Sequence, residues 1–390
     1  MAVSTPPWPA VMIGGPPHAG KSTLIYHLTH ALRDRRVTHY VLRSAPDGEG
    51  DWAYESSPET VRILRIKGKY TQTWVDRMCR DIRSRHLPLL VDVGGWPQDG
   101  QEEIFRCCTH AVILSRYDDS RRFWLRLARD ARLELIADLH SDLQGQERID
   151  DAGAPLRGVI AGLTREYRGG PVFSSLTERI VALFEPYAEA AREAHLSEGR
   201  KRADRLIDLE AEARALGIDP TNWKPTDLAR LLPRACDAGT IAAYGRAPVW
   251  VYGALAFCAA ASPFLQFDVR QGWLAAPQII HAGETLGLQV KSGLTRAGHL
   301  LVRLRIEGGY LDYEDPIHLP RPPISPDRGV IIEGKLPAWL YCGLVRAWRD
   351  ARWVAIYYPQ LDGQAVVIGS HDRMVLPGEL VAVDLSDVSW

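Results

Sequence analysis

The sequence has almost no net charge. Its 390 residues include 47 lysines and arginines against 48 aspartates and glutamates, a formal charge of -1. A balanced total gives no overall attraction to nucleic acid, so a site for an anion has to be local. We therefore expect no DNA partner.

Cysteine is also scarce. The six cysteines show no CxxC spacing and lie largely in apolar or helical contexts: Cys79, Cys107, Cys108, Cys236, Cys258 and Cys342. This pattern argues against a zinc site and against a disulfide framework. It predicts reduced, buried thiols in a cytoplasmic protein.

Long hydrophobic runs are missing as well. The longest, residues 247–265, is interrupted by Gly253, Ser262 and Pro263. Residues 1–15 lack the basic start and long apolar core of a signal peptide. We therefore expect no membrane partner and no secretion signal.

Residues 1–196 alternate between apolar runs and helical patterns. Near-continuous apolar runs at residues 10–13, 87–95 and 109–116 are typical of buried parallel strands. Helical periodicity separates them, for example over residues 70–85. The alternation predicts an α/β domain built on a doubly wound parallel sheet.

Three further segments are expected after this domain. Residues 197–232 have the pattern of a charged helix with an apolar stripe, which is either a solvated connector or an assembly helix. Residues 233–289 and 290–390 contain short strands with Gly and Pro turns. They are predicted to form a tandem pair of small α/β modules, of which the first is truncated.

The stretch GPPHAGKS fits the Walker A pattern G-x-x-x-x-G-K-[ST] and lies between a predicted strand and a predicted helix. Such a loop points backbone N–H groups at a phosphate beside a helix N-terminus. Its lysine reaches the β/γ-phosphates, and its serine ligates Mg²⁺. We predict that ATP is bound by Gly15, His18, Ala19, Gly20, Lys21, Ser22 and Thr23.

Asp92 ends the apolar run LPLLVD, the expected place for a Walker B carboxylate that holds the water shell of magnesium. Ser22 and Asp92 are therefore the predicted metal ligands. No side chain stands out as an activator of water, so ATP hydrolysis stays open. The basic cluster Ser120–Arg132 is either a source of a phosphate-sensing arginine or a solvated helix face.

The C-terminal half contains an internal repeat. Residues 245–272 align with residues 334–363 when Trp250 is set on Trp339. The aligned pairs are Gly245 with Gly334, Pro248 with Pro337, Tyr252 with Tyr341, Leu255 with Leu344 and Phe264 with Trp353. We call residues 233–289 the first copy and residues 290–390 the second copy. The first copy is expected to lack the strands that residues 300–319 supply to the second.

Residues 329–372 resemble the CRISPR-associated ring nucleases, a family first described as manganese-dependent RNA deadenylases. The shared pattern is G-V-x-I-x-G-x-x-P-x-W-L-x-C, then V-A-x-Y-D-P-R-L-G, then S-H, and relatives fused to an AAA-like ATPase domain are part of the family. The resemblance implies binding of cyclic oligoadenylate, chiefly cyclic tetra-adenylate, and its cleavage to linear products. It also implies Mn²⁺ as a further metal and a homo-oligomer that holds the ring between symmetric faces.

The two copies depart from the family pattern in complementary ways. The acid and the arginine of Y-D-P-R-L-G are replaced in the second copy and kept in the first as Asp268 and Arg270. The replacements in the second copy are Tyr358 and Gln360. The Ser-His pair is kept in the second copy as Ser370 and His371 and replaced in the first by Ile279 and Ile280. The family's histidine after the helix falls on Ala261 and Asp350.

The resemblance makes four residues the candidate catalytic set: Asp268, Arg270, Ser370 and His371. An RNA phosphodiester breaks by attack of its own 2′-hydroxyl once that oxygen is aligned with the leaving oxygen, so positioning supplies much of the rate. Arg270 would stabilise the developing charge, His371 would move a proton, and Asp268 would orient a base or ligate Mn²⁺. The candidate ligand contacts are Arg246, Trp250, Tyr252, Lys335 and Tyr341, with Trp339 as a further stacking surface. Core packing is the alternative for Trp250 and Trp339.

Three functions remain open at this point. The first is a ring nuclease that ends type III CRISPR signalling and carries an ATP-binding domain. The second is a decayed sensor that captures the ring and regulates the N-terminal domain. The third is a kinase activity of that domain, which would consume ATP only with a hydroxyl acceptor. Convergence of Asp268, Arg270 and His371 would favour cleavage.

Overall fold

The structure, a computed structural model, describes residues 8–44, 71–98, 100–236, 239–259, 261–307, 311–320 and 327–389. The chain divides into two compact units. The first unit is Met1–Glu193 with Val269–Gln271, and the second is Ala194–Asp268 with Gly272–Trp390. Both units mix helices with parallel strands, so the predicted α/β class is confirmed.

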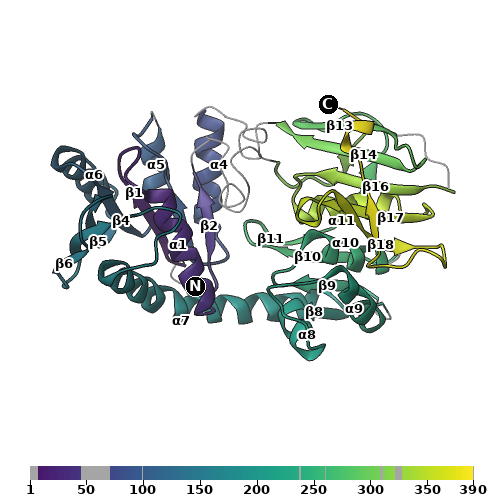
Figure 1. Cartoon of the computed structure of the whole chain (residues 1–390), viewed down its shortest axis with the longest axis horizontal. Coiled ribbons are helices and arrows are strands. Elements are labelled where there is room, and N and C mark those ends of the chain that lie inside the picture. The colour runs from purple at the N-terminus through teal and green to yellow at the C-terminus, as the bar shows by residue number, and fades with distance from the viewer. Residues whose placement is uncertain are drawn as a thin grey trace, which may run out of the picture. The chain divides into compact units, whose positions relative to one another are not determined.

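The first unit is built on a seven-stranded sheet of order β2-β3-β1-β4-β5-β7-β6 (Figure 1). Neighbouring strands are parallel except β6 and β7. The strands are β1 Ala10–Gly14, β2 Tyr40–Arg43, β3 Leu89–Asp92, β4 His110–Ser115, β5 Glu134–Asp142, β6 Arg148–Asp151 and β7 Leu156–Ala161. The helices are α1 Lys21–Asp34, α4 Gln72–Arg83, α5 Gln101–Phe105, α6 Asp118–Asp130 and α7 Pro171–Arg202, of which α7 belongs to the first unit only as far as Glu193.

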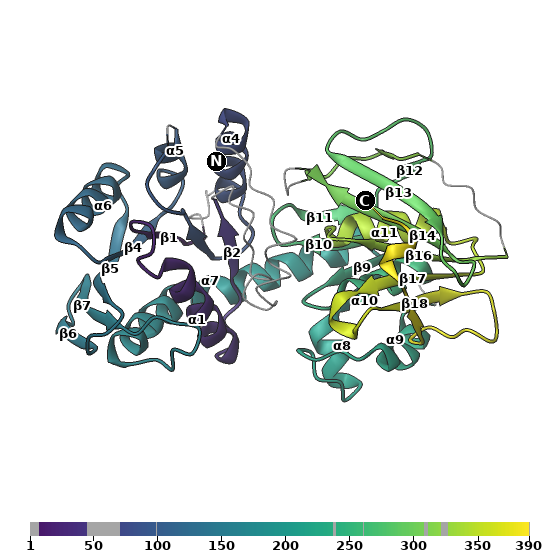
Figure 2. The same ribbon diagram turned by 45° about the horizontal axis from the view of Figure 1, so that its top comes forward.

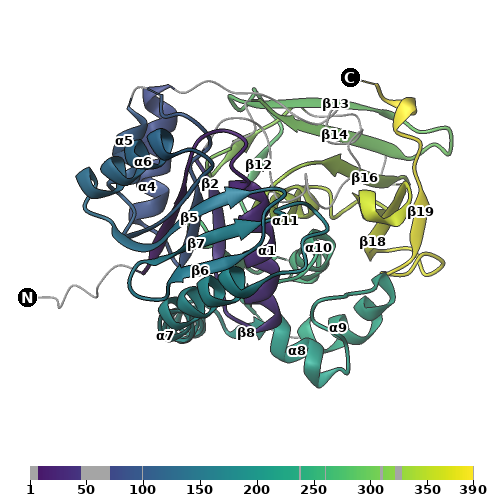
Figure 3. The same cartoon turned by 60° about the vertical axis from the view of Figure 1, so that its left-hand side comes forward.

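Helices cover both faces of this sheet. On one face, Leu28 of α1 and Phe184 of α7 share a buried cluster with Val112 of β4, and Figure 3 shows α7 alongside β5, β7 and β6. On the other face, the fully buried ring of Trp124 on α6 lies 5.9 Å from that of Phe105 on α5. Burial on both faces explains why the strands are continuous apolar runs in the sequence.

The second unit contains two larger sheets and a two-stranded one, β12-β15. The larger sheets have the orders β11-β10-β9-β8 and β13-β14-β16-β17-β18-β19. The elements up to β12 are β8 Arg205–Asp208, α8 Leu209–Ala215, η1 Pro225–Asp227, α9 Leu228–Ala235, β9 Ile241–Tyr244, α10 Val249–Cys258, β10 Phe264–Asp268, β11 Gly272–Ala275 and β12 Ile279–Ile280. The others are β13 Leu288–Leu294, β14 Leu300–Ile306, β15 Ile317–His318, β16 Gly329–Gly334, α11 Ala338–Ala347, β17 Trp353–Tyr358, η3 Pro359–Leu361, β18 Gln364–Ser370, β19 Leu380–Ala382 and η4 Leu385–Asp387.

The two larger sheets share one arrangement (Figure 2). Strands β8, β9 and β10 run parallel and β11 runs antiparallel to β10. Strands β14, β16 and β17 likewise run parallel, and β18 runs antiparallel to β17. Helix α10 connects β9 to β10 as α11 connects β16 to β17.

Each of these helices also packs on the sheet of the other copy. Gly253 of α10 lies so close to β17 that a Cβ there would be 2.6 Å from Ile356 Cδ1. The thiol of Cys342 on α11 donates to Gln266 Oε1 of β10 at 3.3 Å. One buried cluster therefore includes α10, α11 and strands of both sheets.

Two expectations need correction, one about the segment that follows residue 197 and one about the strands of the first copy. The single helix expected from residue 197 ends at Arg202, and β8 and α8 follow it. The first copy was expected to lack a strand next to β9, but β8 takes that place, as β14 does beside β16. Strand β8 was missed because it is only four residues long and has charged residues at both ends.

The expectation of six reduced thiols is also corrected. Cys236 and Cys258 form a disulfide that joins the end of α9 to the last residue of α10. The other four cysteines are free and buried, as predicted: Cys79, Cys107, Cys108 and Cys342. Within the described ranges, no helix has the length and apolar character needed to cross a membrane.

Candidate functional site

The loop between β1 and α1 has a backbone that depends on glycine. Gly15 has φ 152°, and a Cβ on it would lie 1.9 Å from the Leu114 carbonyl oxygen of β4. Gly20 has φ 89° and caps the N-terminus of α1, which has no side-chain cap. His18 has φ 60° and is exposed. The loop therefore lies tightly against β4 and leaves the first N–H groups of α1 without a side-chain acceptor, as an anion site requires.

Lys21, the first residue of α1, is only 6% exposed. Its Nζ donates to the carbonyl oxygen of Pro16 at 2.7 Å, within the same loop. Burial lowers the pKa of Lys21 to about 8, and the nearby charge of Asp92 opposes this shift. A buried ammonium group that donates to a carbonyl of its own loop is well placed to exchange that partner for a phosphate oxygen.

Asp92 lies at the end of β3, directly beside this loop, and is 3% exposed. Its Oδ2 accepts a hydrogen bond of 3.0 Å from Ser22 Oγ, and its Oδ1 accepts one of 3.2 Å from the Gly94 backbone N–H. The structure thus brings together both predicted metal ligands. A hydroxyl and a carboxylate at hydrogen-bond distance are the oxygen donors that Mg²⁺ favours, so the residues fit this metal.

The remaining predicted loop residues lie around this pair. Ala19 is buried, and its backbone N–H donates to Pro16 O at 3.4 Å. Thr23 is half-buried in the first turn of α1. Its position next to Ser22 makes it a second hydroxyl near the N-terminus of the helix.

The strand order supports the same location independently of the motif. From β1 the chain crosses over β3 to β2, whereas from β4 it continues in the opposite direction to β5. In open α/β sheets, ligands bind outside the carboxyl ends of strands at such a reversal. The Gly15–Ser22 loop lies there, next to the end of β4. No group of three or more His, Cys, Asp or Glu side chains suited to a metal occurs among the described residues.

Arg43 was not singled out from the sequence, although it lies next to Asp92, the predicted metal carboxylate. It is the last residue of β2, it pairs in register with Asp92, and its Nη1 lies 3.8 Å from Asp92 Oδ2. The available signal was a basic residue directly after the short apolar stretch Val41–Leu42. A sequence does not show which strands are neighbours, and so the contact with Asp92 could not be predicted.

In the second unit, the repeat preserves one hydrogen bond. The hydroxyl of Tyr252 donates to the carbonyl of Gly245, and that of Tyr341 donates to the carbonyl of Gly334. Both glycines have positive φ, 111° and 159°, in the turn that leads into α10 or α11. The pKa of both tyrosines is raised, chiefly by burial. These side chains hold the turns closed.

For the aromatic candidates, the structure shows core packing, the alternative to stacking on adenines. Trp250 is 1% exposed and Trp339 is fully buried, so both rings are covered by protein in the shared core. Tyr252 and Tyr341 are buried as well. The sequence placed all four beside the turns correctly, but exposure depends on the packing of both copies.

The two basic candidates are on the surface. Arg246 and Lys335 follow Gly245 and Gly334 directly, at matching positions of the two turns, and both are exposed. Partial desolvation lowers the pKa of Lys335 to about 8. The structure therefore keeps these two cations accessible to a phosphate.

Asp268 and His371 are not brought together within the chain. Asp268 ends β10 beside β9, whose end leads through Gly245 into the N-terminus of α10. The ring of His371 lies 5.8 Å from that of Phe257, in the last turn of α10. Ten helical residues span roughly 15 Å, so the carboxylate and the imidazole lie at opposite ends of this helix.

His371 is held in one orientation. Its Nε2 donates to the Arg349 carbonyl at 2.8 Å, which leaves Nδ1 of the neutral ring as an acceptor. Ser370 Oγ accepts from the Asp372 backbone N–H at 3.0 Å and so closes the turn that presents the histidine. Ser370 is therefore a positioning residue in this structure.

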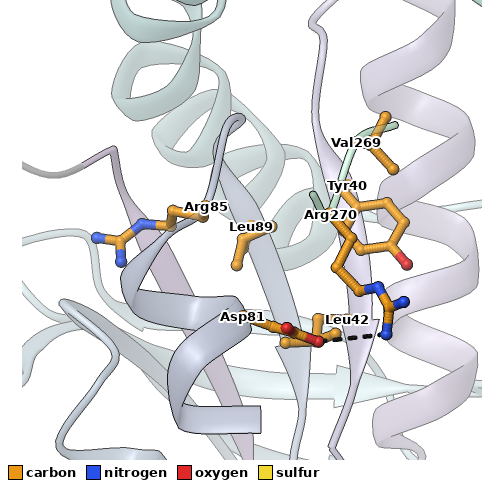
Figure 4. Close-up of a pocket in the computed structure, with 7 residues that line it drawn as sticks. All are labelled: Tyr40, Leu42, Asp81, Arg85, Leu89, Val269 and Arg270. Carbon is orange, nitrogen blue, oxygen red and sulfur yellow. Dashed lines mark ion pairs between the residues drawn. The ribbon is translucent and has the colours of Figure 1, made fainter. Parts of the chain in front are cut away.

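Arg270 is grouped with the first unit, together with Val269 and Gln271. Its Nη1 lies 3.5 Å from Asp81 Oδ2 of α4, as Figure 4 shows, and its side chain is largely covered. Arg270 thus has a carboxylate partner outside the predicted catalytic set.

One comparison with known families bears on the second copy. Residues 305–382 match the family model of the CRISPR-associated protein Cas_csx3. The Cas_csx3 match runs from the end of β14 to the end of β19 and includes Lys335, Tyr341 and His371. It excludes the first unit and the first copy, and with them Asp268 and Arg270. The CRISPR association predicted from the sequence is confirmed for this segment.

Proposed function

We propose that the first unit is a P-loop domain that binds ATP with Mg²⁺. The observation that carries the proposal is the 3.0 Å hydrogen bond between Ser22 Oγ and Asp92 Oδ2, beside the buried ammonium of Lys21. The Gly15–Ser22 loop would cradle the phosphates with its N–H groups. The bound ion would neutralise phosphate charge, while Lys21 would exchange Pro16 O for a phosphate oxygen.

We further propose that the second unit is a tandem pair of ring-nuclease-like modules that binds cyclic oligoadenylate, most often cyclic tetra-adenylate. The Cas_csx3 match supports this for the second copy. The shared strand order and the repeated Tyr–Gly hydrogen bond support it for the first. Arg246 and Lys335 would contact ring phosphates from the two equivalent turns.

Cleavage to linear products is the activity we propose for this unit, which would end a type III CRISPR signal in the cytoplasm. The scissile bond breaks when the adjacent 2′-oxygen attacks phosphorus and the 5′-oxygen leaves. His371, with Nδ1 free to accept, is suited to move the proton. Asp268 would orient a base or hold Mn²⁺ at the other end of α10. Because the two lie apart in one chain, a site that uses both requires a homo-oligomer.

The separation of Asp268 and His371 equally favours a second function. In this alternative, the second unit captures the ring without cutting it and regulates the nucleotide-binding unit. The regulated activity of the nucleotide-binding unit would then be ATP hydrolysis or phosphoryl transfer to a hydroxyl acceptor.

A single set of incubations separates these functions. The full chain is incubated with cyclic tetra-adenylate, with and without Mn²⁺ and ATP, beside Asp268→Ala, His371→Ala and Lys21→Ala. Linear products that disappear in Asp268→Ala or His371→Ala establish the nuclease. Tight ring binding without products under every metal establishes the sensor. Binding of ATP that disappears in Lys21→Ala, measured by calorimetry, establishes the P-loop.

A further inference from the structure

Arg43 and Asp92 are fixed side by side at the carboxyl edge of the first sheet. They are register partners on the parallel strands β2 and β3. Ser44, the residue after the end of β2, is fully buried and donates to the Asp92 carbonyl from both its N–H, at 2.9 Å, and its Oγ, at 3.0 Å. The backbone position of Arg43 relative to Asp92 is therefore locked by the strand pair.

The guanidinium of Arg43 forms an ion pair with the carboxylate oxygen that accepts from Ser22, the predicted metal-ligating hydroxyl. Asp92 Oδ2 lies 3.0 Å from Ser22 Oγ and 3.8 Å from Arg43 Nη1. The side chains of Arg43 and Asp92 are only 11% and 4% exposed, so solvent screens this pair weakly. Asp92 thus has two cationic neighbours, Lys21 and Arg43, and the local charge of the three side chains is positive.

The order of elements along this edge places Arg43 on a defined side of the site. The phosphate loop follows β1, Asp92 ends the neighbouring strand β3, and Arg43 ends β2 beyond it. A nucleotide whose phosphates are cradled by the loop would direct its terminal phosphate toward the metal ligands. Arg43 lies on the far side of Asp92 from the loop.

The geometry points to Arg43 as a residue that binds the terminal phosphate of a nucleoside triphosphate, so that the site distinguishes triphosphate from diphosphate. The inference rests on the nucleotide site proposed above. When Asp92 takes a divalent cation, its attraction for Arg43 is replaced by repulsion between two positive groups. The guanidinium then exchanges the carboxylate for the terminal phosphate, which it can grip with two parallel N–H groups.

A purely structural role for Arg43 makes a different prediction. If the guanidinium only neutralises Asp92 and holds the end of β2, its removal would disturb the metal carboxylate whatever the nucleotide. The affinities for triphosphate and diphosphate would then fall together. The ratio of the two affinities therefore separates the two roles.

The test measures equilibrium binding to the full chain by calorimetry with Mg²⁺, using the non-hydrolysable triphosphate AMP-PNP and ADP. We expect Arg43→Ala to weaken AMP-PNP binding about 10- to 100-fold and ADP binding less than about threefold. Arg43→Lys keeps the charge but lacks the planar guanidinium. Its affinity for AMP-PNP should lie between those of the wild type and Arg43→Ala. Arg80→Ala removes an exposed arginine of α4 in the same unit and should change neither affinity.

The failure of this inference differs from the failure of the nucleotide site. Wild-type protein that binds neither nucleotide overturns both. Wild-type protein that binds both, with Arg43→Ala and Arg43→Lys leaving the ratio of affinities unchanged, overturns only the role of Arg43. If Arg43→Ala does not fold, the ratio measured for Arg43→Lys alone decides.

Discussion

Asp268 and His371 lie at opposite ends of helix α10. The carboxylate ends β10 next to the turn that starts the helix, and the imidazole packs on Phe257 in its last turn. Tyr252 ties the first turn of the helix to the Gly245 carbonyl, and Gly253 packs closely against Ile356 of β17. A rearrangement within one chain is therefore a poor route to a joint site, whereas two chains supply both groups without any change of fold.

The first prediction is complementation between two inactive chains. Asp268→Ala and His371→Ala should each lose ring cleavage when assayed alone. In an equal mixture, a site that takes Asp268 from one chain and His371 from another is intact in about one quarter of random pairings. Product analysis of the mixture should recover roughly that fraction of wild-type activity. A mixture as inactive as its components would contradict a shared site.

The second prediction concerns the hydrogen bond that the repeat preserves. Tyr341→Phe removes the buried donor to the Gly334 carbonyl, and Tyr252→Phe removes the donor to Gly245. Each should lower the free energy of unfolding by about 1–2 kcal/mol, because a half-buried carbonyl loses its partner. Urea denaturation measures the loss as a lower midpoint at an unchanged slope.

Tyr117→Phe is the control for this pair, because its side chain is 70% exposed. It should stay within about 0.5 kcal/mol of the wild type. A neutral result for both Tyr252→Phe and Tyr341→Phe would show that these hydroxyls do not hold the turns.

The third prediction is a dependence of ring binding on pH through Lys335. Its pKa is lowered to about 8 by desolvation, so its positive charge is complete well below pH 8 and is lost as the pH rises through that value. The charge of a phosphodiester does not change over this range. The affinity for cyclic tetra-adenylate should therefore fall by up to about tenfold between pH 7 and pH 9.5.

Lys335→Arg separates this effect from general changes with pH, because a guanidinium stays charged throughout. The variant should keep its affinity constant where the wild type loses it. Parallel pH profiles for the two proteins would exclude Lys335 as a phosphate contact.

The sequence predicted what depends on contiguous residues. The loop Gly15–Ser22 is a single stretch whose residue types fix its backbone, and Asp92 follows an apolar run that identifies its strand. Arg43 was not predicted because its role depends on the pairing of β2 with β3, which local patterns do not encode. Strand β8 was missed because it is short and charged at both ends, and its pairing with β9, beyond α8 and α9, is likewise not encoded by local patterns.

The repeat shows the same limit on predicting binding residues from the sequence. Alignment of the two copies located the turns with Arg246 and Lys335, and the structure leaves both residues exposed. It also suggested stacking by Trp250, which lies in a core formed by both copies. Aromatic residues are expected both at a site that stacks adenines and in a core. The packing of α10 against the other sheet shows that Trp250 belongs to the core.

The last prediction concerns the disulfide between Cys236 and Cys258, which closes a loop with a sequence separation of 22 residues. Closing a loop of this length lowers the entropy of the unfolded chain. In this account it raises the free energy of unfolding by roughly 3 kcal/mol. Thiol titration of the denatured protein without reductant should detect the four free cysteines. Dithiothreitol should lower the unfolding midpoint of the wild type and leave that of a Cys236→Ser, Cys258→Ser double variant unchanged. Six titrated thiols, or equal responses of the two proteins to the reductant, would show that α9 is held on α10 by packing alone.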